Sequence, residues 1–304
     1  MKVVVTGASG LLGRQVVREA ERRGHTVVGT ALSRAQPPQL VKLDLNDATA
    51  VEAFFASEQP QAIIHCAAEK RPDVAEQNQA ATEQLNAVVP GLLAQIAKDL
   101  GAFFAYVSTD YVFDGTAPPY EVGDTPNPLN FYGRTKLAGE QAVQRANPEA
   151  AILRVPVLYG PTEYAAESAV NVLVDAVKNT AASAKMDAWQ ARFPTCTEDV
   201  ARVLVDLGEI SVGAVGEGVA GVFHFSASEQ MTKYDMCQVF ARLLGMPDSL
   251  HHIAPITEKP AAEQMASRPD NTQLSTAALE EIGVNINCVP FEQWWAGYLN
   301  SKTT

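Results

Sequence analysis

The chain has 304 residues, 47% of them hydrophobic and 19% charged, with a formal net charge of −12 and a pI near 4.9. The length fits one large domain or two smaller ones, and the acidity, with no run of Lys or Arg to interrupt it, argues against nucleic acid or a membrane as a partner. Four separated Cys residues without a CxxC pair indicate reduced thiols rather than a disulfide frame or a metal site. No secretion signal is recognisable and no apolar run approaches the roughly 20 residues of a membrane span, so a soluble, cytoplasmic protein is expected.

Short apolar segments alternate with helical patterns through the first half of the chain. Strands are predicted at residues 2–6, 26–30, 40–43, 62–65, 103–108 and 151–158, and helices at 11–23, 48–57, 75–100 and 134–145. This alternation predicts the α/β class, with a doubly wound parallel sheet that carries helices on both faces. Sheets of this kind bind dinucleotides.

The regular alternation loosens after Pro161. Thr232 and Asp235 have the spacing of a capping box at the start of a helix that Gly245 would end. The other elements expected here are helices at 168–179 and 291–299, a strand at 222–225, and irregular segments at 246–260 and 267–271. We therefore expect a nucleotide-binding domain over residues 1–162 and a smaller substrate or lid domain over residues 163–304. The second domain is expected to be partly interleaved with the first, and the strand at 222–225 is the segment that would return to the main sheet.

A glycine-rich turn connects the first strand to the first helix. Gly7, Gly10 and Gly13 have the spacing GxxGxxG. Gly7 allows a tight turn, Gly10 lets backbone N–H groups approach a pyrophosphate, and Gly13 lets the helix pack closely on the strand. Because strand, turn and helix are in register, this pattern favours dinucleotide binding over a purely structural turn.

The end of the second strand indicates which dinucleotide is bound. A site for NAD usually has an acidic residue there to hold the adenosine ribose, whereas this chain has Leu32, Ser33 and Arg34 and no acidic residue before Asp44. Arg34 and Ser33 suit a 2′-phosphate through charge-assisted hydrogen bonds. The alternative is that Arg34 is an ordinary solvated charge. NADP is therefore favoured over NAD.

Thr109, Tyr132 and Lys136 form the pattern of an oxidoreductase site. Lys136 follows Tyr132 by one helical turn, so both side chains share a face. A cation about 4 Å from the phenolic oxygen would favour the phenolate by about 4 kcal/mol, or roughly three pKa units. Thr109 at a strand end could bind a substrate carbonyl, Tyr132 could supply a proton, and Lys136 could hold the nicotinamide ribose.

These motifs together resemble the extended short-chain dehydrogenase/reductase family. The segments STDYVFDG (108–115), PLNFYGRTK (128–136) and RPDNTQL (268–274) are similar to those of its dTDP-4-dehydrorhamnose reductase branch. This resemblance implies an NADPH-dependent reductase of a nucleotide-linked 4-keto sugar, with Thr109, Tyr132 and Lys136 as catalytic residues.

Three longer segments resemble the regulatory β subunits of methionine adenosyltransferase, which share this fold, bind NADP and are not catalytic. They are HCAAEKRPDV (65–74), MDAWQARFPT (186–195) and EQMTKY (229–234), and the likeness extends from Val3 to about Gly283. This resemblance implies a protein that associates with a methionine adenosyltransferase catalytic subunit and tunes S-adenosylmethionine synthesis.

The resemblance to the β subunits also implies a set of NADP-binding residues. The pyrophosphate would contact Ser9, Gly10, Leu11 and Leu12. The adenosine phosphate end would contact Leu32, Ser33 and Arg34, and the adenine would contact Asp44 and Leu45. The rest of the site would be lined by Cys66, Lys70, Tyr132, Lys136 and Leu158. Lys70 stands where the β subunits carry Arg. Cys66 is expected to be a wall residue and not a nucleophile.

Two departures keep both interpretations open. Val157 stands where the rhamnose-forming reductases have Trp, which removes an aromatic surface near the substrate. The C-terminal residues 294–304 do not match the tail that the β subunits insert into the catalytic subunit interface. Trp294 and Trp295 in this tail fit a partner anchor and the packing of a terminal helix equally well. The longer matching segments favour the regulatory subunit, and the intact Thr–Tyr–Lys set favours the reductase.

Overall fold

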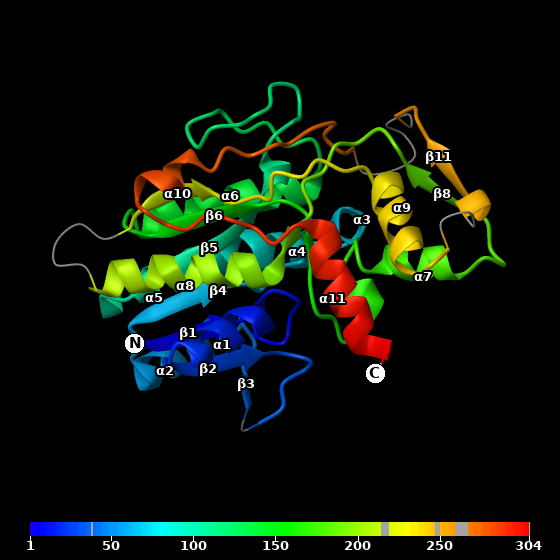
Figure 1. Cartoon of the computed structure of the whole chain (residues 1–304). Coiled ribbons are helices and arrows are strands. Elements are labelled where there is room, and N and C mark those ends of the chain that lie inside the picture. The colour runs from blue at the N-terminus through cyan, green and yellow to red at the C-terminus, as the bar shows by residue number, and fades with distance from the viewer. Residues whose placement is uncertain (38, 214–218, 247–249, 260–266, 304) are drawn as a thin grey trace.

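A seven-stranded parallel sheet lies at the centre of the molecule. We describe it in a computed structural model that covers residues 1–37, 39–213, 219–246, 250–259 and 267–303 (Figure 1). The strand order is β10-β6-β5-β4-β1-β2-β3, and every neighbouring pair is parallel. The strands are β1 (Lys2–Thr6), β2 (Thr26–Ala31), β3 (Leu40–Lys42), β4 (Ala62–His65), β5 (Phe103–Thr109), β6 (Ala151–Val155) and β10 (Gly221–His224). The predicted α/β class with a doubly wound parallel sheet is confirmed.

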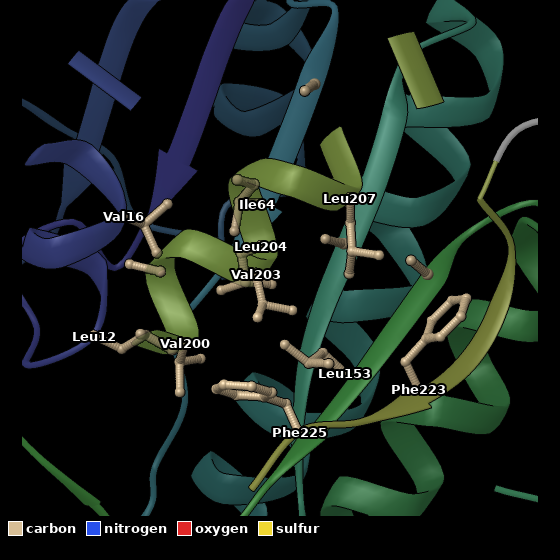
Figure 2. Packing of buried hydrophobic residues seen from close by; sticks show 14 of the residues in the cluster. Leu12, Val16, Ile64, Leu153, Val200, Val203, Leu204, Leu207, Phe223 and Phe225 are labelled. Atoms are coloured by element: carbon tan, nitrogen blue, oxygen red, sulfur yellow. The ribbon is translucent and has the colours of Figure 1, made fainter. Parts of the chain in front are cut away.

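Helices cover both faces of this sheet, so its strands are apolar on both sides. Val3 and Val5 of β1 point to the face covered by α1 (Gly13–Arg22) and α8 (Thr197–Gly213). Val4 points to the opposite face, which is covered by α2 (Ala48–Glu58), α5 (Val89–Leu100) and α6 (Phe131–Ala146). Figure 2 shows the first of these layers, in which α8 side chains such as Val203 and Leu207 pack beside Leu153 of β6.

The predicted helix at 75–100 is wrong in its continuity. The segment consists of α3 (Pro72–Gln77), α4 (Gln79–Glu83), a π-helical turn (Gln84–Val88) and α5. Asn78 has non-helical dihedral angles. Further on, Pro90 has no N–H to donate to the carbonyl of Asn86, and the hydroxyl of Tyr106 donates to that carbonyl instead, at 3.0 Å.

The predicted strand at 151–158 is also divided, because Pro156 cannot donate a ladder hydrogen bond. It forms β6 and then β7 (Leu158–Tyr159), which pairs with β9 (Thr195–Cys196). A further small sheet joins β8 (Ala184–Asp187) to β11 (Ile253–Ile256), although residues 246–260 were expected to be irregular.

Among the described residues, the second half of the chain also forms α7 (Val172–Lys178), α9 (Lys233–Leu243), α10 (Ala277–Glu281) and α11 (Phe291–Thr303), with short 3-10 turns at Ala165–Glu167 and Leu250–His252. A further 3-10 turn, Asp110–Val112, follows β5. The predicted capping box at Thr232 and Asp235 is confirmed. In Figure 1, α7, α9, β8 and β11 gather at the end of the molecule away from α5 and α10.

Helix α11 is held by an aromatic cluster. Trp295 is 1% exposed and packs against Phe240 of α9 and Tyr159 of β7. Trp294 is half-buried, and its Nε1 donates to Glu198 at 2.5 Å. The sequence left two roles open for these tryptophans, a partner anchor and the packing of the terminal helix. The structure shows the packing.

Two elements from the second half of the chain belong to the central sheet layers. Helix α8, which the sequence patterns did not predict, packs on α1, and β10 pairs with β6. The division of the chain at residues 162 and 163 stays a prediction.

Candidate functional site

The predicted site residues gather where the parallel strands end. The glycine turn follows β1, Leu32 to Arg34 follow β2, Asp44 follows β3, Cys66 follows β4, and Thr109 ends β5. Since β4 lies on the opposite side of β1 from β2, the strand order reverses here, and open α/β sheets bind ligands at such a point. The sheet topology therefore brings these residues to one edge.

The glycine turn leaves no space for side chains at two positions. Gly7 has a φ of +70°, and a Cβ there would lie 2.7 Å from the backbone nitrogen of Ala67. A Cβ on Gly13 would lie 2.2 Å from the carbonyl oxygen of Gly7. The amide of Gly10 closes the turn by donating to this same oxygen at 2.8 Å. The backbone thus forms a bare cradle at the start of α1, which fits a pyrophosphate group.

A cavity of about 310 Å³ adjoins this cradle at the end of β2. It is lined by Ser9, Arg14, Ser33, Arg34, Ala35, Gln36, Leu40 and Glu163. Arg34 is not simply solvated, because it donates to Glu163 at 2.9 Å and also to Glu167. Two guanidinium groups and a serine hydroxyl in one cavity fit the phosphate-bearing adenosine end of a dinucleotide.

The other predicted adenosine and wall residues have different surroundings. Asp44 is exposed and accepts hydrogen bonds from Asn46 at 2.9 and 3.0 Å, while Leu45 is buried. The ammonium group of Lys70 donates to the carbonyl of Glu167 at 2.5 Å. Burial raises the pKa of the Cys66 thiol to about 12, so this thiol is neutral at neutral pH.

Helix α6 positions Tyr132 and Lys136. Asn130 caps this helix by accepting from the amide of Gly133 at 2.8 Å. A Cβ on Gly133 would lie 2.3 Å from the carbonyl oxygen of Tyr111, so glycine lets the helix approach the end of β5. Tyr132 is consequently 9% exposed and lies within hydrogen-bonding reach of Thr109.

The expected lowering of the Tyr132 pKa by Lys136 is wrong. Burial raises the pKa of the phenol well above its usual value, and the hydrogen bond with Thr109 opposes this only in part. The reason is that Lys136 points elsewhere: its Nζ donates to the carbonyl of Val107 at 2.7 Å and lies 3.9 Å from the centre of the Tyr106 ring. Tyr132 is therefore a protonated phenol at neutral pH.

Lys136 has an environment of its own. It is 2% exposed, and burial lowers its pKa to about 7, although Glu140 opposes the shift. The neighbouring His65 accepts or donates one hydrogen bond with Thr6 at 2.6 Å, while its Nε2 is buried and has no partner within the described residues. Burial also lowers the pKa of His65 to about 3, so this imidazole is neutral.

The sequence analysis missed four residues at this edge. Asp110 is buried and accepts from Thr272 at 2.5 Å, which ties the RPDNTQL segment to β5. Arg14, Glu163 and Glu167 form an ion-pair cluster beside Arg34. One signal was available: Arg14 is a cation in the first turn of a helix, where the dipole disfavours it. No comparable signal marks Glu163 or Glu167.

Within the described ranges, no group of three or more His, Cys, Asp or Glu side chains could hold a metal ion. No helix in the same residues is long and apolar enough to cross a membrane.

Comparison with known families identifies the fold family. The model of the RmlD substrate binding domain matches residues 1–300. The chain belongs to this family.

The relatives include methionine adenosyltransferase subunits and sugar reductases. The bovine (Bos taurus) methionine adenosyltransferase 2 subunit beta is 47% identical over 283 residues, which cover 93% of this chain and 83% of the relative. A dTDP-4-dehydrorhamnose reductase from Clostridium acetobutylicum is 29% identical, has a TM-score of 0.84 and covers 100% of both chains. Another such reductase, from Bacillus anthracis in complex with NADP, is 23% identical, has a TM-score of 0.82, and covers 99% of this chain and 98% of its own. Both predicted resemblances are confirmed.

Proposed function

We propose that this protein is an NADP-binding regulatory β subunit that associates with a methionine adenosyltransferase catalytic subunit and tunes S-adenosylmethionine synthesis. The observation that carries the proposal is the 47% identity over 283 residues to methionine adenosyltransferase 2 subunit beta. An identity of this size over nearly the whole chain includes the surface as well as the core. It exceeds the 29% identity to the reductase from Clostridium acetobutylicum.

The proposed cofactor is a nicotinamide dinucleotide, and NADP rather than NAD. The bare backbone cradle at Gly7 and Gly13 suits the pyrophosphate. Arg34 and Ser33 line the cavity next to it, and no acidic residue follows β2 to hold an unphosphorylated ribose. A protein of the same fold was solved with NADP, which agrees with this assignment.

Tyr132 and Lys136 could bind the cofactor in a protein that is not catalytic. Both side chains are buried at the carboxyl edge of the sheet, where they would hold the nicotinamide ribose. When bound, the nicotinamide could supply a hydride, but a regulatory subunit needs the ribose contacts alone. The intact Thr–Tyr–Lys set is therefore compatible with a protein that binds the cofactor and does not consume it.

The test of this proposal is reconstitution with a methionine adenosyltransferase catalytic subunit. We expect the two chains to co-elute in size-exclusion chromatography, and we expect the rate or substrate affinity of S-adenosylmethionine synthesis to change on mixing. Tyr132→Phe separates the two uses of this residue: it removes the hydroxyl that would donate a proton, while Lys136 remains to hold the ribose, so the regulatory effect should be kept. Absence of both co-elution and any kinetic change would refute the proposal.

The second candidate function is an NADPH-dependent reductase of dTDP-4-dehydrorhamnose. It is favoured by the placement of Thr109 within hydrogen-bonding reach of Tyr132 and by the 29% identity to a reductase with full coverage. A phenol that is protonated at neutral pH is in the form needed to donate a proton to a carbonyl oxygen. Val157 does not provide the aromatic surface expected in such enzymes.

Loss of NADPH absorbance in the presence of dTDP-4-dehydrorhamnose distinguishes the two functions. Turnover at roughly one per second or more, abolished in Tyr132→Phe, would establish the reductase. We expect saturable NADPH binding without such turnover.

A further inference from the structure

Arg14 lines the same cavity as Arg34, although it comes from helix α1 and not from the end of β2. Its side chain is only 15% exposed. Since a cation in the first turn of a helix opposes the helix dipole, Arg14 needs a local anionic partner to remain there.

Glu167 is that partner, and it holds both arginines. Arg14 donates to the two carboxylate oxygens of Glu167 at 2.6 and 3.1 Å, and Arg34 also donates to this carboxylate. The side chain of Glu167 is 3% exposed. Although burial opposes it, the hydrogen bonds from Arg14 and Arg34 lower the pKa of Glu167 to about 2. Glu167 is thus a buried, charged anchor.

Glu163 contacts the same arginines in a different way. Its side chain is 53% exposed and lies on the cavity wall, where it accepts from Arg34 at 2.9 Å and lies 3.5 Å from Arg14. Exposed ion pairs of this kind contribute little to stability and are screened by salt. A stronger anion can therefore replace Glu163 without disturbing the buried part of the cluster.

Arg34 retains donors for such an anion. Its Nη1 donates to Glu163 and Glu167, whereas its Nε and Nη2 donate to no residue in the part of the chain that the structure describes. The Nε and Nη2 groups form one edge of the guanidinium, with two parallel N–H donors that can bind phosphate in a bidentate manner. Lys70 adds a third cation through its bond to the Glu167 carbonyl. Three cations against two carboxylates leave a local positive excess in a protein of net charge −12.

We propose that Arg14 and Arg34 form a phosphate clamp, that Glu167 positions both guanidinium groups, and that Glu163 is an exchangeable counter-ion which the 2′-phosphate of the cofactor replaces. This inference rests on the proposed NADP binding and adds the residues that set its phosphate specificity. Arg14 contributes mainly charge, because its Nη1 is also tied to the carbonyl of Ser9 at 2.7 Å. That bond couples the clamp to the pyrophosphate turn.

The test compares two glutamates that differ in burial. Dissociation constants for NADPH and NADH are measured by calorimetry for the wild type, Glu163→Gln and Glu167→Gln, and again with adenosine 2′,5′-bisphosphate and adenosine 5′-monophosphate. Glu163→Gln should tighten NADPH binding by roughly two- to five-fold and leave NADH unchanged. Glu167→Gln should weaken NADPH binding by about ten-fold or more, with a smaller effect on NADH.

Glu19→Gln is the matched control, because Glu19 lies on the same helix as Arg14 but pairs with Arg22 and Arg23. It makes the same change in net charge and should alter no affinity. An unchanged NADPH affinity in Glu163→Gln, or an equal gain for NADH, would overturn the role of Glu163. Tighter NADPH binding in Glu167→Gln would overturn the positioning role. Absence of NADPH binding to the wild type would instead refute the proposed function itself.

Discussion

Asp110 and Asp114 lie in one loop after β5 but have opposite environments. Asp110 is 7% exposed, and burial raises its pKa from 3.8 to about 6 although Thr272 and Thr109 donate to it. Asp114 lies near the surface, where hydrogen bonds from Thr116, Asn127 and Tyr120 hold its pKa well below its usual value. The pair shows that the sign of a pKa shift depends on whether hydrogen bonds or desolvation dominate.

Asp110→Asn should raise the free energy of unfolding at pH 7 and leave it nearly unchanged at pH 3.5. Between pH 3.8 and about 6 the folded chain holds a proton on Asp110 that the unfolded chain has lost, so stability falls as the pH rises through this window. The upper limit of the gain at pH 7 is about 3 kcal/mol. Urea unfolding at the two pH values measures it.

Asp114→Asn is the internal control with the opposite sign. Because its folded pKa lies below 3.8, Asp114 contributes stability above that pH and loses it as the pH falls. The variant should be less stable than the wild type at pH 7, and the difference should shrink in acid. The same sign for both variants at pH 7 would contradict the assignment of their environments.

At the scale of elements, the buried parallel strands can be predicted well from the sequence. The predicted strand at 62–65 coincides with β4, and the glycine turn predicts the start of α1 to within a few residues. Strands that are covered on both faces carry continuous apolar runs, and such runs stand out from their surroundings. Connection rules limit the possible orders of the strands in such a sheet, but the sequence patterns did not predict one.

Elements that depend on tertiary contacts are harder to predict. The π-helical turn at Gln84–Val88 depends on a hydroxyl of β5 that takes over the Asn86 carbonyl. The phosphate clamp joins Arg14 to Glu167, which are separated by 153 positions in the chain. The orientation of the Lys136 side chain toward the Val107 carbonyl likewise depends on how α6 packs against β5. Local patterns in the sequence, such as periodicity and motif spacing, contain no information on contacts between residues that are far apart in the chain.

Trp295→Ala should lower the free energy of unfolding by about 3–5 kcal/mol. The indole is 1% exposed and packs on Phe240 and Phe291, so its removal leaves a cavity. Gln293→Ala, an exposed position of the same helix, should change stability by less than about 0.5 kcal/mol. Denaturant unfolding followed by near-UV circular dichroism measures both. Unchanged stability with lost binding to the catalytic subunit would show that Trp295 is a partner anchor.

At the scale of the whole molecule, the central sheet is assembled from both halves of the chain. Helix α8 contributes Val200, Val203 and Leu204 to the core beside β1, and β10 contributes Phe223. In Figure 1, α8 extends along the sheet from α5 toward α11. Leu279 of α10 lies in this same core, whereas α7, α9 and α11 pack around Tyr159 in a hydrophobic cluster of their own. The hydroxyl of Tyr298 on α11 also accepts from the amide of Thr162 at 3.4 Å, next to the segment that carries Glu163.

A fragment of residues 1–162 should consequently fail to fold by itself, although it contains every predicted cofactor residue. Without α8 and β10, one face of β4, β5 and β6 loses much of its cover, although α1 still packs on β1. An exposed apolar face of this kind causes aggregation. Far-UV circular dichroism, tryptophan fluorescence and NADPH binding should report one common unfolding transition in the full chain. The fragment should bind no NADPH unless residues 163–304 are co-expressed with it. A monomeric fragment with native near-UV dichroism and full NADPH affinity would show instead that the nucleotide-binding half is an independent domain, and that the buried face of α8 contributes little to its stability.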